Sequence, residues 1–187
     1  FGDRVDDQVD HLTKASDLKA IKGPTITKYQ SHYGNALLTR HKIVDVRRID
    51  LSAGAREPRG ALDVNLDIDG RIVRIIVTHL GLSVAERQFQ FRKLRSLIDS
   101  VEGGTQIVMG DFNEWYPFSR PIAWLNRNFG RSPAKFTFPS NFPVLPLDRI
   151  WVKPNGALIE LEVHVTPLSR VASDHLPVKA TVDLARQ

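Results

Sequence analysis

The alternation of apolar and polar residues predicts a β-hairpin over residues 61–77. Asp69-Gly70 is a typical two-residue hairpin turn, and the returning segment, 71–77, is rich in β-branched residues. In the first half of the hairpin every second residue is apolar, namely Leu62, Val64, Leu66 and Ile68. This pattern is typical of a strand with one buried face.

The polar residues of the same strand imitate a calcium-binding loop. Asp63, Asn65 and Asp67 match the start of such a loop, but Ile68 stands where the loop needs Gly and Arg74 where it needs Glu. We therefore expect the three residues on the solvent-facing side of the strand, and we assign them no metal.

A helix is predicted after the hairpin, and a strand after the helix. Ser83 and Glu86 have the spacing of a capping box, and Gly103-Gly104 would end the helix. The strand that follows covers residues 105–109. The apolar stripe of the helix consists of Val84, Phe91, Leu94, Ile98 and Val101.

This strand–helix–strand order is typical of a βαβ crossover. It would place His79, at the end of the first strand, and Asp111, at the end of the second, on the same edge of a sheet. Open α/β sheets bind ligands at such edges.

The segment IVMGDFNEW, residues 107–115, ends the second strand with polar side chains. In an extended chain Asp111 and Asn113 would share one face while Phe112 packs on the other. Gly110 would allow a sharp turn or a close backbone approach. The alternative is an ordinary turn, in which Asp and Asn bond to their own backbone.

Two later segments repeat this pattern of polar residues at strand ends. In LDRIWV, residues 147–152, Asp148 begins an apolar strand, where a buried carboxylate would need a reason. In SDHLPVKATV, residues 173–182, Asp174 and His175 directly precede a strand. The repetition favours a functional site over three unrelated turns.

The segment between these motifs, residues 115–147, is rich in proline and aromatic residues. We predict a short helix from Pro121 to Phe129, capped by Ser119 and stopped by Gly130. We expect its Trp124, Leu125 and Phe129 in the core rather than as a platform for stacked bases. A long irregular segment beside a site is a reasonable place for substrate selection.

The composition is that of a globular protein: 187 residues, 42% hydrophobic and 25% charged. The absence of cysteine excludes disulfides and thiolate metal sites, and no apolar run approaches the roughly 20 residues of a transmembrane helix. The net charge of +5 favours anionic partners only weakly, because the basic residues are dispersed. We favour a cytoplasmic location, and the sequence leaves the oligomeric state open.

Four short motifs occur in order: THLG at 78–81, GDFN at 110–113, LDRI at 147–150 and SDH at 173–175. Together they resemble the endonuclease/exonuclease/phosphatase superfamily. YGNALLTR at 33–40 also resembles a strand of that family, and the similarity runs from about residue 29 to the end of the chain.

The resemblance implies an α/β (α+β) fold of two packed mixed β-sheets flanked by helices, the DNase I-like four-layer sandwich. Residues 1–187 would form a single domain of this kind. The family's first strand, helix and second strand, which carry an early metal-binding Glu, have no counterpart here, and neither Glu57 nor Glu86 matches that Glu. We therefore expect a fragment of a longer protein, with little activity on its own.

The resemblance also implies a metal ligand and a group that acts on water. Asp174 would bind Mg²⁺, or Mn²⁺ as the alternative, since these cations prefer oxygen ligands. Asp111 would orient or deprotonate the attacking water. Asn113 would hold the phosphate or keep Asp111 in place.

Three further residues are implied at the phosphate. His175 would contact the scissile phosphate and stabilise its developing charge. Asp148 would bond to His175, fixing its tautomer and favouring the imidazolium. His79 would contact the phosphate region.

The implied function is Mg²⁺-dependent hydrolysis of phosphate esters. The substrate stays open between nucleic acid and a lipid or small-molecule phosphodiester or phosphate ester. The alternative is a catalytically inactive module of the same fold that binds phosphate or nucleic acid.

Overall fold

The computed structural model describes residues 8–28, 31–101, 103–116 and 118–186. In chain order its elements are α1 (Gln8–Ser16), β1 (Lys19–Lys28), β2 (Ser31–Thr39), β3 (Lys42–Asp50), β4 (Gly60–Ile68), β5 (Arg71–His79), α2 (Val84–Asp99), β6 (Thr105–Asp111), α3 (Arg120–Phe129), β7 (Asp148–Lys153), β8 (Leu158–Val163), α4 (Pro167–Ala172) and β9 (Val178–Val182).

A five-stranded sheet in the order β3-β4-β5-β6-β7 forms the centre of the fold. Strands β5 and β6 are parallel and the other neighbours are antiparallel, so this sheet is mixed. Helix α2 connects β5 to β6, which confirms the predicted βαβ crossover. The second layer contains two antiparallel strand pairs, β1-β2 and β8-β9. Within the described residues these two pairs do not join into one mixed sheet.

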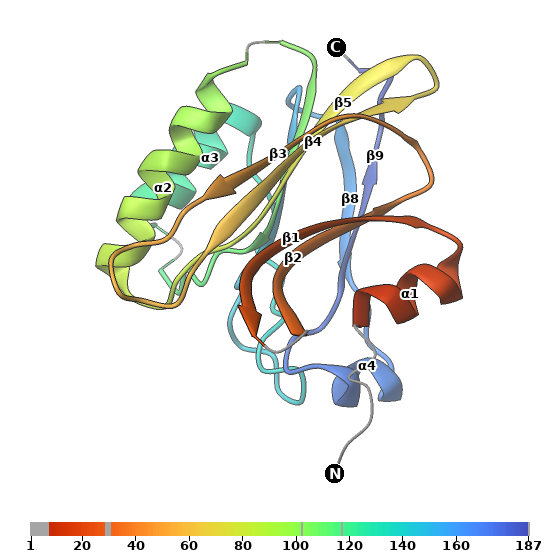
Figure 1. Cartoon of the computed structure of the whole chain (residues 1–187). Coiled ribbons are helices and arrows are strands. Elements are labelled where there is room, and N and C mark those ends of the chain that lie inside the picture. Colours follow the sequence, from red (N-terminus) through yellow and green to blue (C-terminus); the bar gives the residue numbers. More distant parts are fainter. Residues whose placement is uncertain (1–7, 29–30, 102, 117, 187) are drawn as a thin grey trace.

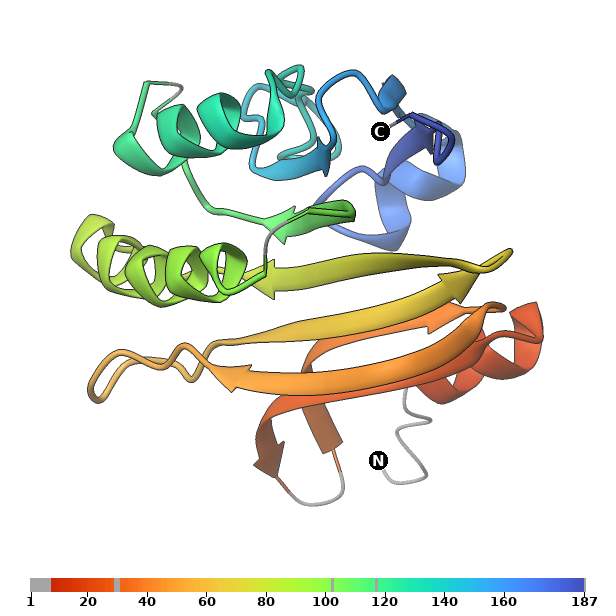
Figure 2. The same ribbon diagram turned by 90° about the horizontal axis from the view of Figure 1, so that it is seen from above.

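The layers are visible in Figures 1 and 2, where α2 and α3 lie together on one side of the five-stranded sheet. On that side Leu94 of α2 and Leu125 of α3 pack against Ile76 and Val108 of the sheet. The opposite face packs against the β1-β2 pair through a second core that contains Ile21, Leu37, Leu62, Val64 and Ile75. Packed sheets flanked by helices are the predicted fold class.

The predicted hairpin of residues 61–77 is confirmed as β4 and β5, but of its polar residues Asp63 is buried, whereas Asn65 and Asp67 are partly exposed. Asp63 is 2% exposed, and its carboxylate accepts two hydrogen bonds from Arg74, at 2.8 and 2.9 Å. Arg74 also donates to the carbonyl of Leu97, at the end of α2. The expectation that Asp63 faces solvent was wrong because α2 covers this face of the hairpin. The guanidinium of Arg74 bonds to backbone carbonyls that have no partner within the helix at its end.

Helix α2 differs from its predicted pattern at both ends. The Ser83 side chain caps the helix by accepting from the backbone N–H of Glu86, at 3.2 Å. The Glu86 carboxylate accepts from Gln90 instead of closing a capping box. Val84 and Val101 are exposed, since Val84 lies in the first turn and Val101 lies beyond the last residue of the helix.

Helix α3 is confirmed, with its start one residue earlier than predicted, at Arg120, and its end at Phe129. Ser119 caps it and Gly130, with φ of 86°, follows its last residue. Leu125 and Phe129 are buried as expected, whereas Trp124 is only partly buried. None of the helices in the described ranges has the length and apolar character needed to cross a membrane.

Candidate active site

Three strands of the central sheet bring the predicted site residues to one edge. His79 is the last residue of β5 and lies opposite Asp111, the last residue of β6, as predicted from the crossover. Asp111 in turn lies opposite Asp148, the first residue of β7. Residues more than thirty positions apart in sequence thus meet because adjacent strands place them in register.

Gly110 makes this alignment possible, as the sequence suggested. Its φ is 143°, and a Cβ atom at this position would lie 1.8 Å from the carbonyl oxygen of Thr78 on β5. Any larger residue would push the ends of β5 and β6 apart. Gly110 therefore holds the strand ends that carry His79 and Asp111 close together.

Asp111 and Asn113 are brought together by a turn and not by an extended strand. Asn113 has φ of 48°, and its backbone N–H donates to Oδ1 of Asp111 at 2.8 Å. Phe112 is buried and packs edge-to-face on Trp151, with ring centroids 4.9 Å apart. The prediction that Asp111 and Asn113 share one face of an extended strand was wrong, because the chain turns directly after Asp111. The alternative, a local turn, is correct.

The carboxylate of Asp111 lies between two histidines. Its Oδ2 is 3.3 Å from Nε2 of His79 and 3.9 Å from Nε2 of His175. Burial raises the pKa of Asp111, although the hydrogen bond from Asn113 opposes this change. A carboxylate with a raised pKa is a better proton acceptor than an ordinary one.

His175 is fixed by a carboxylate on its other ring nitrogen. Its Nδ1 donates to Oδ2 of Asp148 at 2.7 Å, and the ring of Phe138 lies 4.9 Å away. The hydrogen bond to Asp148 is the main cause that raises the pKa of His175 and so favours the imidazolium. A pocket of about 400 Å³ opens beside His175 and Asp148.

Nδ1 of His79 faces a guanidinium, whereas Nδ1 of His175 faces a carboxylate. Nη1 of Arg59 lies 3.2 Å from Nδ1 of His79, and a guanidinium can only donate, so this Nδ1 must accept. We assign the ring proton to Nε2, which lies 3.3 Å from Oδ2 of Asp111. The amide nitrogen of Asn113 lies 3.1 Å from the same Nε2 and also donates to the carbonyl of Leu80 at 2.9 Å.

This arrangement keeps His79 neutral. Burial, followed by the charges of Arg59 and His175, lowers the pKa of His79 to about 4. The site thus contains one imidazole that favours the charged form and one that resists it, on either side of the same carboxylate.

Arg59 was not among the residues predicted from the sequence. It is 5% exposed, lies directly before β4, and pairs with Glu57 at 3.2 Å. Its Nε is buried without a hydrogen-bond partner among the described residues. The only signal in the sequence was a charged residue beside the start of a buried strand, which is too common to identify a site.

The described residues do not form a complete metal site. No group of three or more His, Asp or Glu side chains in this part of the chain is placed to hold an ion. Asp174 is exposed, and its carboxylate accepts one long hydrogen bond, 3.4 Å from the Ser173 hydroxyl. Its backbone oxygen accepts from Ser140, which fixes the chain beside His175. One open carboxylate is therefore available to a cation.

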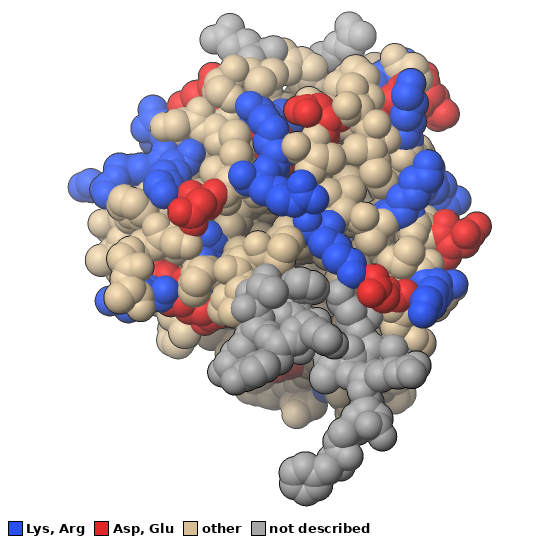
Figure 3. All heavy atoms as spheres, viewed as in Figure 1, with Lys and Arg blue, Asp and Glu red and all other residues tan. Residues whose placement is uncertain are grey.

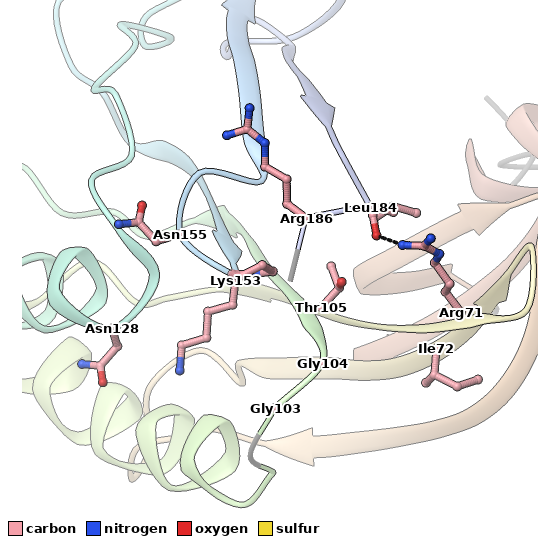
Figure 4. A pocket seen from close by; sticks show the side chains of 11 residues that line it. Arg71, Ile72, Gly103, Gly104, Thr105, Asn128, Lys153, Asn155, Leu184 and Arg186 are labelled. Carbon is pink, nitrogen blue, oxygen red and sulfur yellow. Dashed lines mark hydrogen bonds between the residues drawn. The ribbon is translucent and has the colours of Figure 1, made fainter.

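A separate pocket of about 610 Å³ lies at the opposite edge of the five-stranded sheet (Figure 4). Arg71, Lys153 and Arg186 line it, but their charged ends point apart. Arg71 donates to the carbonyl of Leu184, Arg186 donates to the carbonyl of Gly156, and Lys153 lies over the ring of Phe129. Because these cations do not converge, the pocket is not a second candidate for the active site.

A curated relative shares much of the sequence. The uncharacterized protein YbhP of Escherichia coli K12 is 34% identical over 165 residues, which cover 83% of this chain and 64% of YbhP. The chain thus spans less than two thirds of the length of this relative.

Solved structures share the fold at lower identity. The mannosyl-6-phosphatase Bt3783 of Bacteroides thetaiotaomicron has a TM-score of 0.74 and 17% identity, over 94% of this chain and 81% of its own. D. rerio TDP2, in a complex with a single-strand DNA product, has a TM-score of 0.64 and 16% identity, over 92% and 80%.

A family model covers nearly the whole chain. The model of the Endonuclease/Exonuclease/phosphatase family matches residues 5–175, a range that includes all the site residues described above. The chain belongs to the Endonuclease/Exonuclease/phosphatase family.

Proposed function

We propose that the protein hydrolyses phosphate esters at the edge formed by β5, β6 and β7. The observation that carries this proposal is the placement of the Asp111 carboxylate between a neutral and a charge-favouring imidazole, His79 and His175. Family membership supports a phosphoesterase in general, either a nuclease or a phosphatase.

In the proposed reaction Asp111 accepts a proton from the attacking water. Its Oδ1 accepts a hydrogen bond from the backbone N–H of Asn113, and its Oδ2 lies 3.3 Å from Nε2 of His79, so the carboxylate retains lone pairs for water. The water oxygen bonds to phosphorus as the ester P–O bond breaks, and the departing oxygen takes a proton from solvent. Asn113 holds Asp111 in place through its backbone N–H.

His175 stabilises the charge that develops on the phosphoryl oxygens. Asp148 keeps its ring oriented and favours the charged form, which a developing anion requires. His79, held neutral, lies with its Nε2 3.3 Å from the carboxylate of Asp111 and does not compete for its proton.

Metal dependence is a separate part of the proposal. We propose that Asp174 binds Mg²⁺ or Mn²⁺, with water and the substrate phosphate as further ligands, because Mg²⁺ commonly uses only one or two carboxylates. Bound metal would neutralise phosphate charge. Turnover of the intact protein in Mg²⁺, Mn²⁺ or chelator should require the ion, and Asp174→Asn should raise the Mg²⁺ concentration at half-maximal rate. Full activity in chelator would refute this role.

The substrate is tested with a panel of plasmid DNA, single-stranded DNA, RNA, phosphoinositide, sphingomyelin and a sugar phosphate. We expect the intact protein to hydrolyse at least one of them and Asp111→Asn to abolish that activity. Binding without any turnover across the panel would favour the inactive binding module instead. The incomplete metal site of the described residues is the observation in favour of that second candidate.

A further inference from the structure

The groove between helices α2 and α3 is lined by arginines. It measures about 550 Å³, and none of the described residues that line it carries a carboxylate. The arginines come from both helices, Arg92 and Arg95 from α2 and Arg120 and Arg127 from α3. Figure 3 shows Lys and Arg side chains on the side of the molecule that α2 forms, and also across the centre of the same view.

The charges of this groove are largely unneutralised. Arg120 and Arg127 form no ion pair with any carboxylate of the described residues, and Arg92 lies only over the ring of Phe89, at 5.8 Å. Arg95 alone has an acidic neighbour, Asp99, at 3.3 Å. Four guanidinium groups around one groove raise its positive potential and favour a polyanion.

Aromatic rings lie among these arginines. Phe118 is 93% exposed at the entrance to α3. Trp124 is partly buried and holds the guanidinium of Arg95 over its ring, at 5.2 Å. A basic groove with an open aromatic face is the combination that binds single-stranded nucleic acid, in which phosphates meet cations and bases stack on rings.

The two helices that form the groove start on the side of the sheet where the candidate active site lies. Helix α2 starts five residues after His79, and α3 starts seven residues after Asn113, so both helices lead away from that edge. From Gln88 to Arg95 the groove follows α2 for about 10 Å. A chain bound along the two helices would run toward that edge.

We propose that the α2–α3 groove binds a single-stranded nucleic acid on one side of the phosphate held at the active site. The position of the scissile phosphate rests on the proposed function, whereas binding in the groove does not. A concave groove between two helices suits a flexible strand with splayed bases better than a stacked duplex or a flat membrane.

Binding can be measured without turnover. A labelled oligothymidylate of about 12 nucleotides is titrated in chelator at several salt concentrations, with fluorescence anisotropy as the readout. The double variant Arg120→Gln/Arg127→Gln should weaken binding and reduce the salt slope by about 1.4, because each single-strand phosphate contact contributes about 0.7. Phe118→Ala should weaken binding about tenfold with an unchanged salt slope.

The matched control is Arg71→Gln/Arg186→Gln, which removes the same charge from the pocket at the opposite edge of the sheet. It should leave the salt slope unchanged. All four arginines are outside the hydrophobic cores, and thermal melting checks that each variant folds.

Three results would overturn the proposal. Equal losses in the groove and control variants would mean attraction by net charge alone. Stronger binding of duplex DNA would remove the preference for a single strand. Binding of anionic phosphatidylserine vesicles, with none of the oligonucleotide, would assign the groove to a membrane. Groove-dependent binding without turnover would refute only the proposed function, and turnover without groove-dependent binding would refute only this inference.

Discussion

At the scale of single residues, the two histidines beside Asp111 differ through their Nδ1 partners. Asp148 accepts from Nδ1 of His175, whereas Arg59 donates to Nδ1 of His79. A carboxylate favours the charged ring and a guanidinium opposes it. The pKa values of the two rings are therefore shifted in opposite directions, although both rings face the same carboxylate.

Removal of Arg59 tests this account of His79. The pKa of His79 lies near 4 in the folded protein, so the ring should be neutral, with its proton on Nε2, from above pH 5 upward. In Arg59→Met the pKa should rise, yet stay below 6.5 because burial, the larger cause, remains. Nitrogen-15 NMR reports both tautomer and pKa, with His79→Gln to assign the signal.

Arg48→Met is the matched control, because Arg48 donates to the carbonyl of Lys22 and bonds to no histidine. It should leave the titration of His79 unchanged. A proton on Nδ1 of His79 in the unmodified protein, or the same titration with and without Arg59, would refute the proposed tautomer.

The pair of His175 and Asp148 is tested by a double-mutant cycle. If Asp148 acts by orienting His175, Asp148→Ala and His175→Ala should each reduce turnover. The double variant should then lose far less than the product of the two losses. Strictly multiplicative losses would mean that the two residues act independently.

At the scale of elements, the Asp63–Arg74 pair joins the hairpin to helix α2. Both side chains are nearly inaccessible, and Arg74 also binds a carbonyl at the helix end. Asp63→Ala should lower the free energy of unfolding by about 3–5 kcal/mol, because it leaves a buried charge without its partner. Urea denaturation measures the difference.

Asp67→Ala is the control on the same strand. Asp67 is more exposed and lies 4.0 Å from Lys42, so its removal should cost at most about 1 kcal/mol. Equal losses at the two positions would mean that the buried pair does not stabilise the contact between the hairpin and α2.

The elements themselves were largely predictable from the sequence. The hairpin, the crossover, α2 and α3 follow from local periodicity, turn glycines and capping residues. The burial of Asp63 was not predictable, because it depends on which face of the sheet α2 covers. The alternation of apolar and polar residues does not show whether the polar face is covered by a helix or exposed to solvent.

The site residues at the ends of strands were predictable from the sequence, whereas the residue that a loop brings to the site was not. His79, Asp111 and Asp148 follow from strand order and register. Arg59 reaches His79 from a loop twenty residues earlier in the sequence, and its contact is a matter of tertiary packing.

At the scale of the whole molecule, the fold brings together basic residues that lie far apart in the sequence. The four arginines of the α2–α3 groove are spread over residues 92–127, with no basic run to indicate them. Parallel placement of the two helices on one face of the sheet brings them together. The sequence-based expectation of dispersed basic residues therefore does not hold for this face.

The central claim is that Asp111 activates water for phosphoester hydrolysis, and its most direct test is the turnover of Asp111→Asn. The substitution keeps size and shape but removes the proton acceptor. In the intact protein, with Mg²⁺ and the best substrate of the panel, turnover should fall about 100-fold or more. Melting temperature and oligonucleotide binding should stay unchanged. Turnover within a few-fold of the unmodified protein would contradict the account.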